Sequence, residues 1–278
     1  MNDKGKGIKQ DRPRVAASSY LNSAPLIWSF VHGARRREIE LVTDTAPSRC
    51  AEMLARSEVE AALVPVIEYQ RISNLVVVPG VCVGARSRVR SVVLVTREEI
   101  DNLKQVRSVA LDISSRTSAA MVQIIFREFL GIEPEWTESA PDVAAMLSVS
   151  DAALIIGDPG MTFPRERVVV YDLAELWRKH TGLGFVFAMW MARESEMDEI
   201  SRVDFAGARD EGLAHVEEIA ALYKDKVGLS FDEIRSYLLE NISFELTEEL
   251  SAGLELFYHL AQKQKIIPEV RPLKMIGE

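Results

Sequence analysis

Short apolar runs recur along the chain, and each is followed by a polar turn and a segment with helical spacing. The first three runs are residues 14–17, 40–43 and 61–64. Runs of this length are typical of strands, and helical segments between them predict β-α-β units. We therefore expect an α/β protein, in which ligands bind where strands end.

The middle of the chain predicts a second lobe. A strand at residues 91–95 is expected to leave the first lobe, and a strand at residues 106–111 to open a new sheet. A strand at residues 185–191 is expected to return to the first lobe. The helix that starts within 114–118 is expected to end at Gly131, because glycine favours left-handed helix caps. No Gly/Ser linker is visible, so the two crossing strands are expected to act as a hinge.

These features predict two lobes with a cleft between them. The first lobe is expected to comprise residues 1–93 and 191–278, and the second residues 94–190. Within the first lobe, Pro79-Gly80 is expected to form a turn between two strands. Two roles are open for the helical C-terminal tail. It either covers the first lobe or forms the contact between two copies in a homodimer.

Composition narrows the function classes. The net charge of -9 among 278 residues argues against nucleic-acid binding, which needs clustered Lys and Arg. No apolar run approaches the roughly 18 residues that a membrane span requires. Residues 1–14 are polar and basic, without an apolar segment, so we expect no export signal and a cytoplasmic protein.

Metal and cofactor motifs are not found in the sequence. Cys50 and Cys82 have no paired metal spacing, and the four histidines are scattered without a carboxylate partner. The sequence also contains no glycine-rich phosphate loop. We therefore expect neither metal nor organic cofactor.

A cluster of hydroxyl groups, residues 114–118, falls at a predicted helix start. The cluster contains Ser115, Arg116, Thr117 and Ser118. Free amide groups and the helix dipole favour an anion there, such as a substrate carboxylate. The alternative is that one hydroxyl only caps the helix.

Two other segments are candidate binding sites. Ser19, Tyr20 and Asn22 lie in the first turn after a strand, where either a ligand or an ordinary hydrogen-bonded turn is expected. Gly157 and Asp158 follow a later apolar strand and face the same two alternatives. Glu68 is expected to be an exposed helix carboxylate.

Taken together, six segments of the sequence resemble one enzyme family. They are SYLNSAPL (19–26), ALVPVIEY (62–69), VRSV (89–92), SSRTS (114–118), ALIIGD (153–158) and the segment 171–188. The chain resembles the chorismate dehydratases of the futalosine pathway of menaquinone biosynthesis, over about residues 14–193. The resemblance implies a two-lobed fold like that of type II periplasmic binding proteins.

The resemblance also implies the chemistry. A carbon–oxygen lyase of this family removes water from chorismate and yields 3-[(1-carboxyvinyl)oxy]benzoate without metal or organic cofactor. Asn22 and Ser91 match the family's site positions, so they are expected to hold the ring and the leaving hydroxyl. No protein base is evident, and the substrate's own enolpyruvyl carboxylate is our hypothesis for the proton acceptor.

One local departure and two alternatives remain. Pro159-Gly160 stands where the family pattern predicts two small helical residues, which leaves the geometry after Asp158 open. The first alternative is the related 1,4-dihydroxy-6-naphthoate synthase. The second is a non-catalytic protein that binds small carboxylates, because this fold is mostly used for solute binding.

Overall fold

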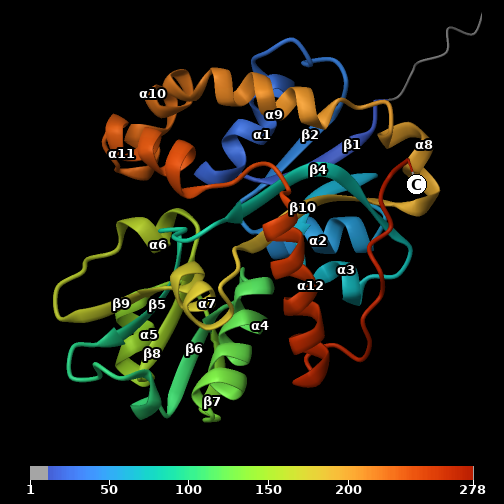
Figure 1. Cartoon of the computed structure of the whole chain (residues 1–278). Helices are drawn as coiled ribbons and strands as arrows, with labels where there is room; N and C mark the ends of the chain where they lie inside the picture. The colour runs from blue at the N-terminus through green and yellow to red at the C-terminus, as the bar shows by residue number, and fades with distance from the viewer. Residues whose placement is uncertain (1–11, 278) are drawn as a thin grey trace, which may run out of the picture.

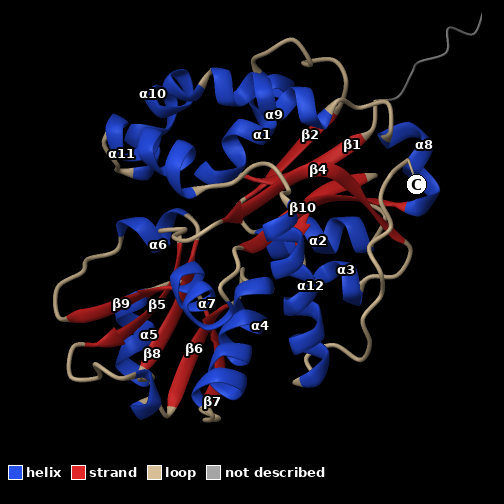
Figure 2. Ribbon diagram, viewed as in Figure 1, coloured by secondary structure: helices blue, strands red, loops and turns tan. Residues whose placement is uncertain are grey.

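The structure, a computed structural model, describes residues 12–277 and contains two lobes, each built on a five-stranded sheet. The predicted α/β fold is confirmed. Figure 1 shows the first lobe above the second, and Figure 2 shows helices packed around both sheets. The first sheet has the strand order β2 (Glu40–Asp44), β1 (Arg14–Ser18), β3 (Ala61–Pro65), β10 (Phe185–Arg193) and β4 (Leu75–Ala85).

In the first sheet, β1 pairs in parallel with β2 and β3, whereas β10 runs antiparallel between β3 and β4. All five residues of β3 are buried, as expected for a strand covered on both faces. The helices that follow these strands are α1 (Ala24–Val31), α2 (Pro47–Ala55) and α3 (Glu68–Arg71), and a 3-10 turn, η1 (Leu21–Ser23), precedes α1. Pro25 and Pro47 each lie in the first helical turn, where a missing amide hydrogen costs nothing.

The second sheet repeats this arrangement in the middle of the chain. Its order is β7 (Glu135–Ser139), β6 (Ser108–Asp112), β8 (Ala152–Ile156), β5 (Val92–Arg97) and β9 (Val168–Asp172). Only β5 runs against its neighbours β8 and β9. The helices of this lobe are α4 (Thr117–Ile124), α5 (Val143–Val149), α6 (Asp158–Thr162) and α7 (Leu173–Thr181), and a 3-10 turn, η2 (Leu103–Gln105), precedes β6.

The predicted helix end at Gly131 is confirmed. After α4 the chain continues as a π-helical turn, η3 (Ile125–Leu130), and Gly131 follows in the left-handed region with φ 70°. The predicted turn at Pro79-Gly80 is wrong, because β4 passes through it as one strand. Cys82 pairs with Met189 and Val77 with Met191, so residues 78–81 form a bulge against β10.

The lobes are joined by short crossing segments rather than by strands. The predicted boundaries at 93/94 and 190/191 fall inside β5 and β10, yet each strand pairs within one sheet along its whole length. We propose boundaries within residues 86–91 and 182–184, which leave both strands intact. The connections expected to be strands are therefore irregular segments, and their role as a hinge stays a prediction.

The C-terminal tail packs mainly on the first lobe. It comprises the helices α8 (Met197–Ile200), α9 (Phe205–Ala214), α10 (Val216–Val227), α11 (Phe231–Ser236) and α12 (Glu248–Lys263), with a 3-10 turn, η4 (Glu194–Glu196), before α8 and a π-helical turn, η5 (Tyr237–Asn241), after α11. Helix α9 lies along α1, whereas α12 contacts both β10 and α4 and so touches both lobes. The alternative in which the tail covers the first lobe is therefore observed, and the homodimer stays a prediction.

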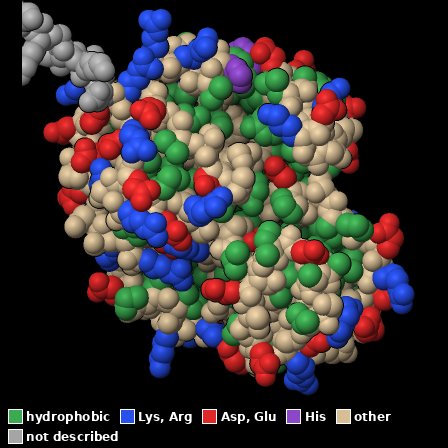
Figure 3. Space-filling model, turned by 180° about the vertical axis from the view of Figure 1, so that it is seen from behind, with side chains coloured by type: hydrophobic (Ala, Val, Ile, Leu, Met, Phe, Trp, Pro, Cys, Tyr) green, Lys and Arg blue, Asp and Glu red, His purple; other side chains and the backbone are tan. Residues whose placement is uncertain are grey.

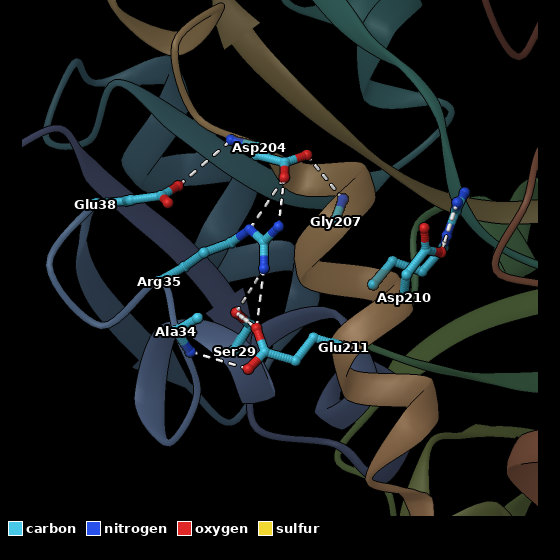
Figure 4. A network of polar contacts seen from close by, with 9 residues as sticks. Ser29, Ala34, Arg35, Glu38, Asp204, Gly207, Asp210 and Glu211 are labelled. Atoms are coloured by element: carbon cyan, nitrogen blue, oxygen red, sulfur yellow. Dashed lines mark hydrogen bonds and ion pairs between the residues drawn. The ribbon is translucent and has the colours of Figure 1, made fainter.

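A polar network fastens α9 to the first lobe (Figure 4). The guanidinium of Arg35 bridges the carboxylates of Asp204 and Glu211. Asp204 directly precedes α9, and Glu211 lies within it. Glu211 also accepts hydrogen bonds from the hydroxyl of Ser29 and the backbone amide of Ala34. These contacts hold the pKa values of Asp204 and Glu211 below their usual range. The largest cause is the hydrogen bond from Arg35 for Asp204 and the hydrogen bond from Ser29 for Glu211.

The surface carries charges of both signs. On the face in Figure 3, Lys and Arg side chains are interspersed with Asp and Glu side chains. None of the helices among residues 12–277 is long and apolar enough to span a bilayer. The expected lack of an export signal was based on residues 1–14. Of these, residues 1–11 lie outside the part of the chain that the structure describes.

Candidate active site between the lobes

A cavity of about 60 Å³ lies between the lobes and is lined from both. Its polar lining gathers at two places, the turn after β1 and the start of α4. The lining consists of Ser18, Tyr20, Asn22, Ser23, Pro47, Leu63, Pro65, Val83, Val92, Ser114, Ser115, Arg116, Thr117, Ser118, Ile156, Gly157, Phe187 and Ala188.

In the first lobe, the turn after β1 aligns three polar side chains. The hydroxyls of Ser18 and Ser23 are 2.9 Å apart, and Ser23 donates to Oδ1 of Asn22 at 3.3 Å. Ser23 has a single hydroxyl proton, so Ser18 must be the donor to Ser23. This series of hydrogen bonds occupies Oδ1 of Asn22. The amide NH₂ of Asn22 has no acceptor among the described residues and remains available to a ligand.

In the second lobe, the start of α4 presents hydroxyls and amides. No side chain caps α4, so the capping alternative for residues 114–118 is wrong. The hydroxyls of Ser115 and Ser118 have no partner among residues 12–277, although both side chains are buried. Because the first amides of a helix have no intrahelical acceptor, those of Thr117 and Ser118 add two further donors.

Ser114 and Thr117 have structural partners. Ser114 donates from its hydroxyl and its backbone amide to Oδ1 of Asp112, at 2.6 and 2.8 Å. Burial raises the pKa of Asp112, although these hydrogen bonds oppose the shift. The hydroxyl of Thr117 accepts from the backbone amide of Ile67 at 3.2 Å, which joins the second lobe to the first.

Arg116 is held by two carboxylates from the first lobe. Its guanidinium donates to Oε1 of Glu52 at 2.7 Å and to Oε2 of Glu68 at 3.0 Å. Glu68 is 2% exposed, so the expectation of an exposed carboxylate is wrong. Its burial is compensated by Arg116 and by Arg71, whose guanidinium lies 3.2 Å from Oε1 of Glu68.

Gly157 and Tyr20 are in close contact across the lobes. Gly157 has φ 68° and ψ -150°, a conformation that side-chain-bearing residues essentially never adopt. A Cβ atom at this position would lie 2.6 Å from the ring of Tyr20. Burial raises the pKa of Tyr20, and Asp112 and Asp158 raise it further, so its phenol stays protonated and can donate.

Asp158 follows Gly157 but does not line the cavity. Its Oδ1 accepts from the backbone amide of Leu21 at 3.0 Å, and burial raises its pKa to about 6. The doubtful geometry after Asp158 is resolved as helix α6, with Pro159 in its first turn. A Cβ atom at Gly160 would lie 2.9 Å from the carbonyl oxygen of Ser91, so a larger residue there would require the backbone to shift.

Besides Asp158, two more predicted site residues, Ser91 and Ser19, do not reach the cavity. Ser91 is 0% exposed, and its hydroxyl accepts from the hydroxyl of Tyr237 at 2.7 Å. It precedes the lining residue Val92 but is not itself part of the lining, so the prediction that Ser91 contacts the substrate does not agree with this geometry. Ser19 is exposed and only donates its backbone amide to Asp44.

Sequence reasoning omitted several lining residues from its site. Ser23 borders the cavity and was missed, although its place in the turn after β1 was an available signal. Ser18 and Ser114, which belong to the candidate segments but were not among the predicted site residues, border the cavity too. The apolar wall was also missed. It is formed by Leu63, Pro65, Val83, Val92, Ile156 and Phe187.

Two α/β lobes that enclose a cavity define a protein of the periplasmic-binding-protein fold class. A protein from Archaeoglobus fulgidus has a similar structure, with a TM-score of 0.75, 19% identity and coverage of 93% of this chain and 100% of that one. The periplasmic aliphatic sulphonate binding protein of Escherichia coli is similar too, with a TM-score of 0.66, 18% identity and coverage of 96% and 94%. At these identities the similarity shows the fold alone.

The chain belongs to the menaquinone biosynthesis family, whose model matches residues 13–263. A curated relative is the chorismate dehydratase of Thermus thermophilus, which is 29% identical over 257 residues. The match covers 86% of this chain and 91% of that protein. The match to the family model therefore covers nearly all of both lobes and most of the tail.

Proposed function

We propose that the protein is a chorismate dehydratase of menaquinone biosynthesis, a carbon–oxygen lyase that converts chorismate into 3-[(1-carboxyvinyl)oxy]benzoate and water. The observation that carries this proposal is the interlobe cavity, in which Asn22 faces the donors at the start of α4. The family match and the relative from Thermus thermophilus support it.

Chorismate has two carboxylates and an apolar ring, and the cavity offers complementary surfaces. One carboxylate is placed at the start of α4, where Ser115, Ser118 and the amide of Thr117 donate hydrogen bonds. The apolar wall holds the ring. Asn22 is placed to donate its free amide hydrogens to the ring hydroxyl that leaves, while Tyr20 and Gly157 close the cavity.

The reaction breaks two bonds on neighbouring ring carbons. The carbon that carries the enolpyruvyl ether loses its proton, and the next carbon loses its hydroxyl, so the ring becomes aromatic and water is released. The described cavity lining contains no Asp, Glu or His. We therefore propose that the enolpyruvyl carboxylate of the substrate accepts the proton and passes it to the departing hydroxyl, which leaves as water, with Asn22 donating a hydrogen bond to that oxygen.

In this proposal the cavity works mainly by orientation. Aromatisation makes the elimination favourable, and fixed donors hold chorismate so that its carboxylate reaches the proton. We place the reaction in the cytoplasm. The free thiols of Cys50 and Cys82 are consistent with a reducing compartment: both are buried, and burial raises their pKa values to about 12.

The test is incubation of the purified protein with chorismate, followed by chromatography and mass spectrometry. The expected product is lighter than chorismate by one water, and Asn22→Asp should slow its formation by about tenfold or more. Asn102→Asp is the matched control, because Asn102 only caps a distant 3-10 turn and aspartate caps equally well.

Other outcomes point elsewhere. Binding of chorismate without turnover would favour the solute-binding alternative. Conversion of a cyclic futalosine derivative instead of chorismate would favour the 1,4-dihydroxy-6-naphthoate synthase alternative. A protein that neither binds nor converts chorismate would overturn the proposal.

A further inference from the structure

Arg116 borders both the interlobe cavity and a second, strongly polar cavity of about 500 Å³. Ser115 and Arg116 line both cavities. The second cavity also exposes Glu52, Arg71 and Glu138. Arg116 therefore forms part of the wall between the two spaces, whereas Glu52 lines only the second cavity, and no other cation lines the interlobe cavity within residues 12–277.

The two carboxylates that hold Arg116 differ in exposure. The side chain of Glu68 is 3% exposed and keeps a second partner, Arg71. The side chain of Glu52 is 41% exposed, and its second contact, to Arg56, is 3.8 Å long. Glu52 can therefore turn to water at small cost, whereas Glu68 cannot lose its charge partners without leaving a buried carboxylate.

The two contacts also use different ends of the guanidinium. Glu68 binds NH1 and Glu52 binds NH2. If Glu52 leaves, NH1 still anchors Arg116 to Glu68, and NH2 becomes free for another carboxylate. A planar guanidinium that is already oriented loses little conformational entropy when it changes partners.

We infer that Glu52 is a specificity-determining residue that competes with the incoming carboxylate of the substrate for the NH2 end of Arg116. This inference rests on the proposed function, because it concerns the same cavity. An anionic ligand displaces Glu52 and gains the guanidinium, whereas a neutral ligand of the same shape cannot. Glu52 thereby selects against uncharged molecules. The anionic substrate loses some affinity in return, because it must displace Glu52.

The inference is tested by steady-state kinetics of chorismate dehydration in Glu52→Gln. The neutral amide competes less well for the guanidinium, so KM should fall about two- to fivefold while kcat changes little. In an Arg116→Gln background, KM should be raised and Glu52→Gln should have no further effect, since the contested group is gone. Glu133→Gln is the matched control, because Glu133 binds Arg127 through two contacts far from the cavity.

The outcomes separate the inference from the proposed function. If wild type converts chorismate but KM in Glu52→Gln is unchanged or raised, the inference is overturned and the function stands. The inference is equally overturned if Glu52→Gln lowers KM to the same extent without Arg116. If wild type does not convert chorismate, the function fails, and calorimetric titration with chorismate decides the inference: tighter binding by Glu52→Gln supports it, and no tightening overturns it.

Discussion

The carboxylate of Asp158 in the second lobe accepts a hydrogen bond from the backbone amide of Leu21 in the first, at 3.0 Å. A second bond between the lobes, from the amide of Ile67 to the hydroxyl of Thr117, joins them at another point near the cavity. Both bonds use residues in the cavity lining or next to it. Opening of the lobes must therefore break polar contacts of the same residues that shape the site.

Asp158→Asn should change how stability depends on pH. Burial raises the pKa of Asp158 from 3.8 to about 6 in the folded protein. Its stabilising contribution is therefore fully present below pH about 4 and is lost as the pH rises through 6. The amide cannot ionise, so near pH 7.5 the variant should be more stable by about 2–3 kcal/mol, and at pH 4 equal to wild type.

The free energy of unfolding, measured in urea between pH 4 and 8, checks this prediction. Burial also raises the pKa values of Asp112 and Asp172, but both residues are present in wild type and variant and cancel in the difference. Asp142→Asn is a suitable control, because Asp142 is an exposed helix cap. A difference between Asp158→Asn and wild type that does not vary with pH would contradict the assignment.

Gly157→Ala should destabilise the protein and disturb the site together. The new methyl group meets both an unfavourable backbone conformation and the ring of Tyr20, with an expected cost of about 2–4 kcal/mol. Gly182→Ala is the control, because Gly182 also has a positive φ but no atom within 4 Å of its Cβ position. It should cost about 1 kcal/mol and leave chorismate turnover unchanged. Equal losses in both variants would show that the contact with Tyr20 is unimportant.

Features of the fold that depend on local chemistry could be predicted from the sequence. The end of the helix at Gly131 follows from the freedom of glycine to adopt positive φ, which needs no knowledge of distant residues. The turn at Pro79-Gly80 was predicted by the same kind of reasoning and was wrong. There the pairing of β4 with β10, about a hundred residues later, overrides the local preference.

The site shows the same division. The hydroxyls near the start of α4 and Asn22 were predicted because strand ends and helix starts favour ligands. The burial of Glu68 was missed because it depends on Arg116, 48 residues further along the chain. The position of Ser91 was missed for a similar reason, since its partner Tyr237 lies 146 residues away in the tail. Such pairings are set by tertiary packing, which a single sequence does not display.

Tyr237→Phe should destabilise the protein through Ser91. The hydroxyl of Tyr237 donates to that of Ser91 in a fully buried environment, so its removal should cost about 1–2 kcal/mol. The double variant with Ser91→Ala should show a coupling energy of about 1 kcal/mol. Tyr258→Phe is the control: its buried hydroxyl donates to the carbonyl of Val66, so its effect should add to that of Ser91→Ala. Urea unfolding of the single and double variants measures both couplings, and additivity for Tyr237 would contradict the pairing.

Asp172→Asn should loosen the first crossing segment. One oxygen of Asp172 caps α7 at Ala174 and Glu175, while the other accepts from the backbone amide of Arg90 at 2.7 Å. Arg90 has a positive φ of 62°, a strained conformation that this bond helps to hold.

An asparagine can accept with only one oxygen, so its NH₂ group would face the amide of Arg90. The expected cost is about 2–4 kcal/mol, because a buried donor loses its partner. Amide hydrogen exchange gives the specific readout: residues 89–91 should exchange faster in Asp172→Asn, and those of β1 should not. Asp204→Asn is the comparison, because Asp204 caps α9 in the tail, away from the crossing. If residues 89–91 keep their protection, the segment is held by packing rather than by Asp172.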